Sequence, residues 1–191
     1  MSAPMKVRGY IVKTSVEYLQ SRLEPSEAST VIDRFSTPVR STLETVKAID
    51  WYPVEQMAEI NQVIVDILGK GDEERARDAM IACGRYMATE ATNTFLRLLM
   101  RVLTPRLFAK KLPDLWSRDC SGGKVTVDVN DERLICRLAG VKDFAHCGPV
   151  SLGWATFALE NMGKPVVKKK LHAWSLATPN PDEVWFEAAW K

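Results

Sequence analysis

The sequence contains little of what most catalytic and metal sites require. Only two of its 191 residues are histidines, and its four cysteines, at positions 83, 120, 136 and 147, have no Cys-x-x-Cys spacing. Scattered ligands of this kind do not indicate a zinc site. Ser151 lacks a Gly-x-Ser-x-Gly surrounding, and Gly122-Gly123 precedes a strand-like run instead of a helix, which argues against a phosphate-binding loop. We therefore expect no catalytic residue and no metal ligand, and predict that the protein is not an enzyme.

An excess of charge of one sign is also missing. The chain carries 26 Lys and Arg residues against 24 Asp and Glu residues, a formal net charge of +2. This balance does not indicate nucleic acid or an anionic membrane as the partner. The longest apolar stretch, around Phe95–Leu103, is interrupted by Arg97 and Arg101 and is too short to span a bilayer. With no apolar leader and four free thiols, we expect a cytoplasmic protein without a membrane span.

The first two-thirds of the chain are predicted to be mostly helical. Val7–Lys13 has strand propensity, but the segments after it combine capping residues with apolar residues at helical spacing. Met57, Ile60 and Ile64, for example, recur every three or four residues and form one apolar stripe. Helices are predicted over residues 14–23, 26–35, 38–48, 54–68, 72–88, 91–103 and 104–111, the last one followed by a separate turn from Pro113.

The last third of the chain has a different periodicity. Residues 124–129 and 133–138 alternate between apolar and polar side chains around an Asn-Asp turn, which predicts a β-hairpin. Pro149–Met162 carries one charge, Glu160, and is typical of an enclosed helix that buries Trp154 almost completely. Residues 166–174 and 184–190 then predict a C-terminal β ribbon. The fold class is therefore α+β, a single domain over residues 1–191 in which a helical N-terminal two-thirds packs on a small antiparallel sheet.

The order of several short landmarks resembles a known family. The landmarks are Val7-Arg8-Gly9, Trp51-Tyr52-Pro53, Leu103-Thr104-Pro105, Leu112–Trp116, Gly153-Trp154 and the terminal Trp190. They resemble a family of bacterial proteins that looks like a branch of the haem-NO-binding, vinyl-reductase-like superfamily, which also includes subunits of transport complexes. The resemblance implies a cavity between helices and sheet, which binds haem, aromatic effectors or a lipid chain in that superfamily, and it implies dimers. The cysteines that vinyl-reductase-like domains carry in the last ribbon have no counterpart in Ala177–Asp182.

His146-Cys147 is the one place where a histidine and a cysteine are adjacent. A haem axial ligand or a Cys/His pair is one interpretation, but neighbouring residues at a helix start diverge by about 100°. A thiol at this helix start is expected to have its pKa lowered by the helix N-terminus. The other interpretation is a small buried cysteine beside a surface histidine. His172 follows Lys168–Lys170, a run typical of an edge strand or, alternatively, of an anion-binding patch. We predict a protein without haem or any other cofactor.

Aromatic residues supply the candidate ligand-binding residues. Such residues either line a pocket or fill a core, and the four selected for the pocket are Phe95, Trp116, Trp154 and Phe157. The leading hypothesis is a non-enzymatic sensor or regulatory domain that binds a small apolar or aromatic ligand and pairs with a signalling protein. The alternative is a protein-interaction or scaffold subunit with a filled cavity. Apolar stripes on the first two helices, at Leu19, Leu23, Val31, Ile32 and Phe35, favour a homodimer.

Overall fold

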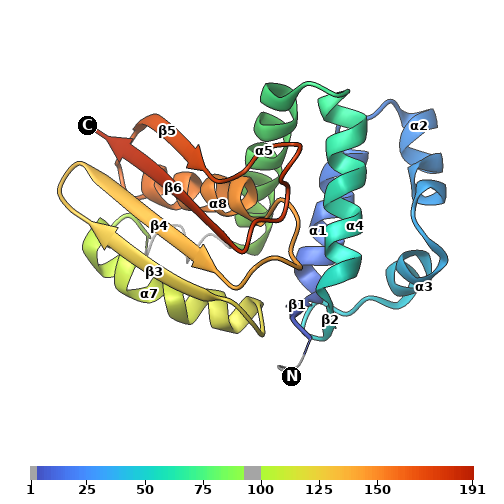
Figure 1. The fold of residues 1–191 in the computed structure, drawn as a ribbon, viewed down its shortest axis with the longest axis horizontal. Helices are drawn as coiled ribbons and strands as arrows, with labels where there is room; N and C mark the ends of the chain where they lie inside the picture. The colour runs from blue at the N-terminus through green and yellow to red at the C-terminus, as the bar shows by residue number, and fades with distance from the viewer. Residues whose placement is uncertain (1–3, 93–99) are drawn as a thin grey trace.

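The computed structural model describes residues 4–92 and 100–191. Figure 1 shows the helices of the first half on one side and a small sheet on the other, with α5 and α8 between them. The first half comprises β1 (Lys6–Arg8), α1 (Gly9–Gln20), α2 (Pro25–Thr30), η1 (Val31–Arg34), α3 (Thr37–Thr45), β2 (Trp51–Pro53), α4 (Val54–Ile64), the π-helical turn η2 (Val65–Gly69) and α5 (Glu73–Ala91). The second half comprises α7 (Pro105–Asp119), β3 (Lys124–Val129), β4 (Arg133–Ala139), α8 (Cys147–Asn161), β5 (Val166–His172) and β6 (Glu183–Trp190). The α+β class is confirmed.

The second half is built around a four-stranded antiparallel sheet with the order β3-β4-β6-β5. The predicted hairpin is β3–β4, and Cys136 of β4 also pairs with Phe186 of β6. Because side chains alternate along a strand, Cys136, Leu138 and Phe186 are buried on the same face of the sheet. β5 is an edge strand, as the run Lys168–Lys170 predicts. A second sheet, β1–β2, joins the N-terminus to the segment before α4.

Helices α5 and α8 pack at very short range. A Cβ atom added at Gly84 of α5 would lie 2.0 Å from the carbonyl oxygen of Val150, and one at Gly153 of α8 would lie 2.0 Å from that of Ile81. Only residues without a side chain allow the two backbones to approach this closely. The predicted enclosed helix is therefore confirmed, although Trp154 on it is half-buried and the prediction that it is almost fully buried was wrong.

The start of the chain differs from the sequence prediction. Strand structure ends at Arg8, and α1 begins at Gly9 instead of at the predicted Thr14-Ser15 cap. The reason is a set of acceptors that lies far along the chain: Gly9 N–H donates to the Asp50 carbonyl at 2.9 Å, and Tyr10 N–H to that of Ala48 at 3.0 Å. These bonds satisfy amides that a helix start otherwise leaves unpaired. Thr14 lies inside the helix and donates to the Tyr10 carbonyl.

Helix α7 runs unbroken through Pro113, where the sequence predicted a break between two short helices. A proline inside a helix removes one backbone hydrogen bond and usually bends or ends the helix. Here Leu112, Leu115 and Trp116 all pack against the core from one face of α7. We infer that this packing stabilises the helix on both sides of Pro113. The predicted helix over residues 91–103 lies largely outside the described residues.

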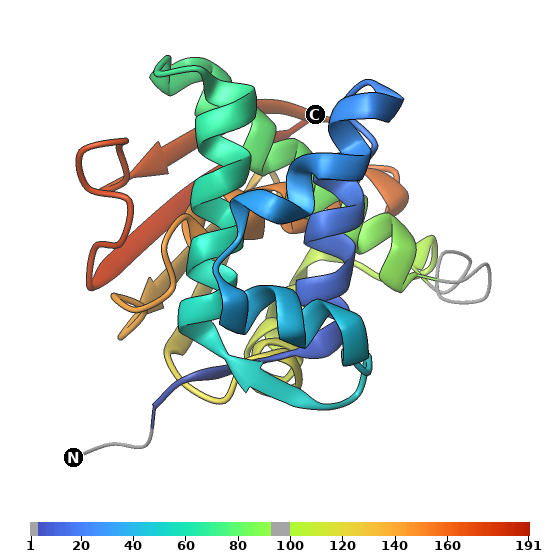
Figure 2. The same cartoon turned by 90° about the vertical axis from the view of Figure 1, so that its right-hand side faces the viewer.

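The N-terminal helices cover their own apolar stripes. Leu19, Val31 and Phe35 are buried, and Leu23 and Ile32 pack against the core. Figure 2 shows α2 and α3 in front of α1 and α4. The stripes therefore do not form the exposed patch on which the predicted homodimer was based, and the homodimer stays a prediction. Within residues 4–92 and 100–191, none of the helices has the length and apolarity needed to cross a bilayer.

Candidate ligand cavity

An apolar cavity of about 110 Å³ lies between α1, α7, α8 and the buried face of the sheet. Helix α7 contributes Leu112, Leu115 and Trp116, and the sheet contributes Leu138 and Phe186. The walls of the cavity are mostly apolar, with Tyr10, Asp119 and Ser151 as the polar residues, so a small and mainly apolar molecule is the kind of ligand that they would accept.

Two of the four predicted ligand-binding residues meet at this cavity. Trp116 and Trp154 both line it, one from α7 and one from α8. Trp116 is held by a hydrogen bond of 2.7 Å from its indole N–H to the Gly122 carbonyl. Phe157 is buried on α8 and is not one of the residues that line the cavity. Phe95 lies outside the described residues.

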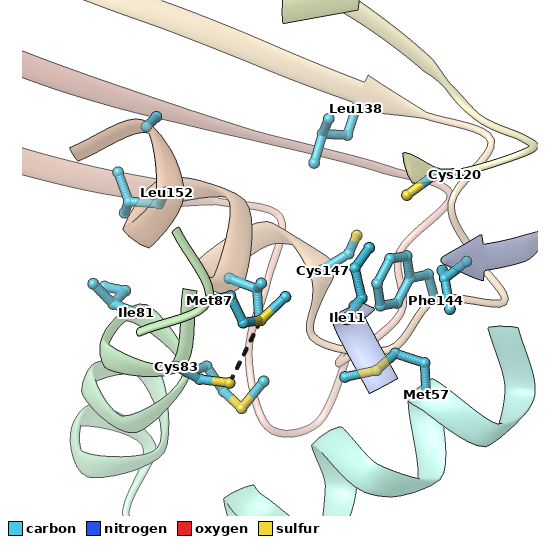
Figure 3. Packing of buried hydrophobic residues seen from close by; sticks show 14 of the residues in the cluster. Ile11, Met57, Ile81, Cys83, Met87, Cys120, Leu138, Phe144, Cys147 and Leu152 are labelled. Atoms are coloured by element: carbon cyan, nitrogen blue, oxygen red, sulfur yellow. Dashed lines mark hydrogen bonds between the residues drawn. The ribbon is translucent and has the colours of Figure 1, made fainter. Parts of the chain in front are cut away.

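Three of the four cysteines also line the cavity, although no short spacing connects them in the sequence. They are Cys120, Cys136 and Cys147, and Figure 3 shows two of them, Cys120 and Cys147, among Ile11, Phe144 and Leu138. Burial raises the pKa of Cys136 and of Cys147 to about 12. The predicted lowering of the Cys147 pKa was therefore wrong, because burial outweighs the backbone hydrogen bonds at the helix start.

These thiols do not make a metal site. Among the residues that the structure describes, no group of three or more Cys, His, Asp or Glu side chains is arranged to hold a metal ion. Protonated thiols are poor ligands and poor nucleophiles. The three cysteines therefore act as small apolar wall residues.

His146 is fully buried, and the prediction that it is a surface residue was wrong. It precedes α8 in a left-handed conformation with φ of 62°. The indole N–H of Trp174 points at Nδ1 at 3.3 Å, and Nε2 lies 3.1 Å from Oε1 of Gln62. Since Nδ1 accepts, we assign the proton to Nε2. Burial lowers the pKa of His146 to about 4, so the ring is neutral at physiological pH.

His172 lies on the sheet, and it is not one of the residues that line the cavity. Its ring stacks on Trp185 with the centroids 3.5 Å apart and the planes at 7°. The guanidinium of Arg137 lies 5.0 Å from the centroid of the same Trp185 ring. The three side chains come from neighbouring positions on β5, β6 and β4 and form one cross-strand stack.

Tyr10 and Asp119 form a polar pair in the wall of the cavity. The Tyr10 hydroxyl donates to Oδ2 of Asp119 at 2.7 Å. Arg118 donates to both oxygens of the same carboxylate, at 2.8 and 2.7 Å. Burial, followed by the Asp119 charge, raises the pKa of Tyr10 well above its usual value, so that the hydroxyl stays protonated.

Sequence reasoning did not find this pair. Tyr10 and Asp119 are 109 positions apart, and neither belongs to a recognisable motif. Both also line a second, polar cleft of about 420 Å³, together with Arg8, Thr14, Ala48, Ile49, Glu90, Ala91 and Arg118. The apolar cavity and the polar cleft therefore adjoin at one hydrogen bond.

Comparison with known proteins finds solved structures with a similar fold. No family model and no curated protein matches the sequence. A mutant H-NOX protein from K. algicida, in the unliganded Fe(II) form, is 12% identical with a TM-score of 0.71, and the alignment covers 96% of each chain. A mutant T. Tengcongensis H-NOX is 10% identical with a TM-score of 0.61, covering 96% of this chain and 97% of that one. An oxygen-binding H-NOX domain related to soluble guanylate cyclases has the same identity and TM-score, covering 96% and 95%. The chain has an H-NOX-like fold.

Proposed function

We propose that this protein is a non-enzymatic sensor or regulatory domain whose ligand is a small apolar or aromatic molecule. The observation that carries the proposal is the apolar cavity of about 110 Å³ between the helices and the sheet. An apolar cavity of about 150 Å³ in another protein stays free of water and binds benzene. The cavity here is of similar size, which supports a ligand near the size of one aromatic ring.

Haem is the group that the fold suggests, and the residues of this chain do not fit it. A histidine ligand would have to be His146 or His172, the two that the sequence contains. Both ring nitrogens of His146 are engaged, by Trp174 and Gln62. His172 lies flat on Trp185 and does not line the cavity. Burial raises the pKa of Cys136 and of Cys147, which line the cavity, so ligation of iron by either thiolate would carry an added cost of deprotonation. We therefore propose that the cavity takes an organic ligand directly.

The proposal is tested by filling the cavity from α7. Leu115 lines the cavity, and Leu107 is 50% exposed on the same helix and does not line it. We expect isothermal titration calorimetry to detect binding of benzene or toluene to the wild-type chain and to Leu107→Trp. Leu115→Trp should abolish that binding by occupying the space.

The scaffold alternative predicts a different result. If neither benzene nor toluene binds or raises the thermal midpoint of the wild-type chain, the cavity does not serve a ligand. Val102 and Leu107, which are 74% and 50% exposed near the start of α7, would then be the apolar residues to test as a contact for a signalling partner. Substituting either one by a charged residue should weaken such a contact without unfolding the chain.

A further inference from the structure

The apolar cavity and the polar cleft share two wall residues. Tyr10 and Asp119 line both hollows, and the hydrogen bond of 2.7 Å between them lies at the junction. Tyr10 and its bond to Asp119 therefore stand between the two hollows. A ligand that filled both would need an apolar body and a polar head, because the two sets of walls differ in this way.

Arg8 is the cation of the cleft that has no carboxylate partner among the described residues. Its guanidinium lies 4.0 Å from the centroid of the Trp51 ring. It also donates to the carbonyl oxygen of Arg118 at 3.0 Å and to that of Ile49. These three contacts fix the plane of the guanidinium, and no described residue accepts from its remaining N–H groups. A fixed guanidinium with free donors is the group that proteins use to bind a carboxylate through two parallel hydrogen bonds.

The other charged residues of the cleft leave Arg8 free to bind an anionic group of a ligand. Arg118 is bound at two points by Asp119, so these two charges neutralise each other. Glu90 lines the cleft and is exposed to solvent, where its charge is screened. Ile49, with 77% of its surface exposed, adds an apolar residue to the wall of the cleft.

We propose that the ligand is an amphipathic carboxylic acid, with its apolar body in the cavity and its carboxylate on Arg8 in the cleft. This inference rests on the proposed function, since the body occupies the same cavity. Tyr10 opens the way between the hollows, and Asp119 stays paired with Arg118, which limits repulsion of the ligand's carboxylate. Ile49 covers the part of the ligand that crosses the cleft.

The test compares three probes by isothermal titration calorimetry with the full chain. Toluene reports on the cavity alone, phenylpropionate adds the carboxylate, and phenylpropanol is its neutral counterpart. We expect phenylpropionate to bind at least about tenfold more tightly than phenylpropanol, since one charge-assisted hydrogen bond alone has about this value and Arg8 can offer two. Arg8→Gln should remove this preference and leave toluene binding unchanged, whereas Arg133→Gln, at an exposed arginine of β4, should preserve both.

The outcomes separate the two proposals. In the first case toluene binds to the chain. If phenylpropionate then binds no more tightly than phenylpropanol, or if it still binds more tightly than phenylpropanol to Arg8→Gln, the carboxylate inference is wrong and the proposed function stands. If toluene does not bind, the proposed function fails too. Should Arg8→Gln fail to fold by circular dichroism, Arg8→Lys keeps the charge without the planar fork. It should lose part of the preference, and an unchanged preference there would also overturn the inference.

Discussion

His146 and Trp174 join the start of α8 to the loop that follows β5, through a hydrogen bond of 3.3 Å from the indole N–H to Nδ1. The two rings meet edge to face, with centroids 5.9 Å apart at 65°. On the other side of the imidazole, Gln62 of α4 accepts from Nε2 and donates to Asp66 at 2.8 Å. One neutral histidine thus connects the helical half to the sheet half.

Protonation of His146 should weaken the fold in mild acid. Burial lowers its pKa from 6.5 to about 4, so the unfolded chain binds a proton between these values that the folded chain does not. The stabilisation is therefore complete above about pH 6.5 and is lost as the pH falls toward 4. The total contribution is about 3 kcal/mol. Urea unfolding of the wild-type chain across this range should show the decline.

A matched pair of variants distinguishes the effect of His146 on the pH dependence of stability from the effect of other groups that bind protons in mild acid. His146→Asn removes the buried imidazole, so its unfolding free energy should fall less steeply between pH 6.5 and 4 than that of the wild type. His172→Asn, on the sheet, is the matched variant at the other histidine of the sequence. Equal slopes in the wild type and His146→Asn would show that the imidazole is not the group responsible.

Trp154 and Phe186 should differ in their contribution to stability although both line the cavity. Phe186 is 1% exposed, and its replacement by alanine should cost about 3–5 kcal/mol, as for other buried aromatic residues. Trp154 is half-buried, so Trp154→Ala should cost less, about 2 kcal/mol. Denaturant unfolding of the two variants measures both values. A larger loss for Trp154 would mean that its outer face is covered in solution.

The elements that could be predicted from the sequence are those with local signals. The hairpin β3–β4 follows from strict alternation around a turn, and Asp72 begins α5 by accepting from the Arg75 amide, as its position suggests. The start of α1 at Gly9 was missed because its first amides donate to carbonyls of residues 48 and 50. The continuity of α7 through Pro113 was missed because packing of its flanking residues overrides the local preference.

The site depends still more on long-range packing. Trp116 and Trp154 could be selected as large aromatic residues, and the structure places both at the cavity. The pair Tyr10–Asp119 belongs to no sequence motif, because the two residues meet only where α1 and α7 pack together. The burial of His146 likewise depends on Gln62 and Trp174, which are far from it in sequence. Contacts of this kind carry no local periodicity that a sequence would reveal.

Glu160 is the one charged residue within α8, and it is paired with Arg85 of α5 at 2.6 Å. The Arg85 side chain keeps 39% of its surface exposed and the Glu160 side chain keeps 35%, so solvent and salt screen the pair. We expect Glu160→Ala to cost at most about 1 kcal/mol and less at high salt. A double-mutant cycle with Arg85→Ala isolates the pair. A coupling several times larger, and insensitive to salt, would show that the pair behaves as a buried one.

The protein should be colourless even when it is produced with abundant haem. An axial histidine would have to give up either the Trp174 or the Gln62 contact, and His146 is fully enclosed by the fold. His172 would have to leave its stack on Trp185. Absorption spectra of the purified chain, before and after incubation with haemin, test this directly, and we expect no Soret band from a specific complex. A stoichiometric Soret band that persists through gel filtration and disappears in His146→Ala would contradict the prediction, because it would require the cavity to reorganise around that imidazole.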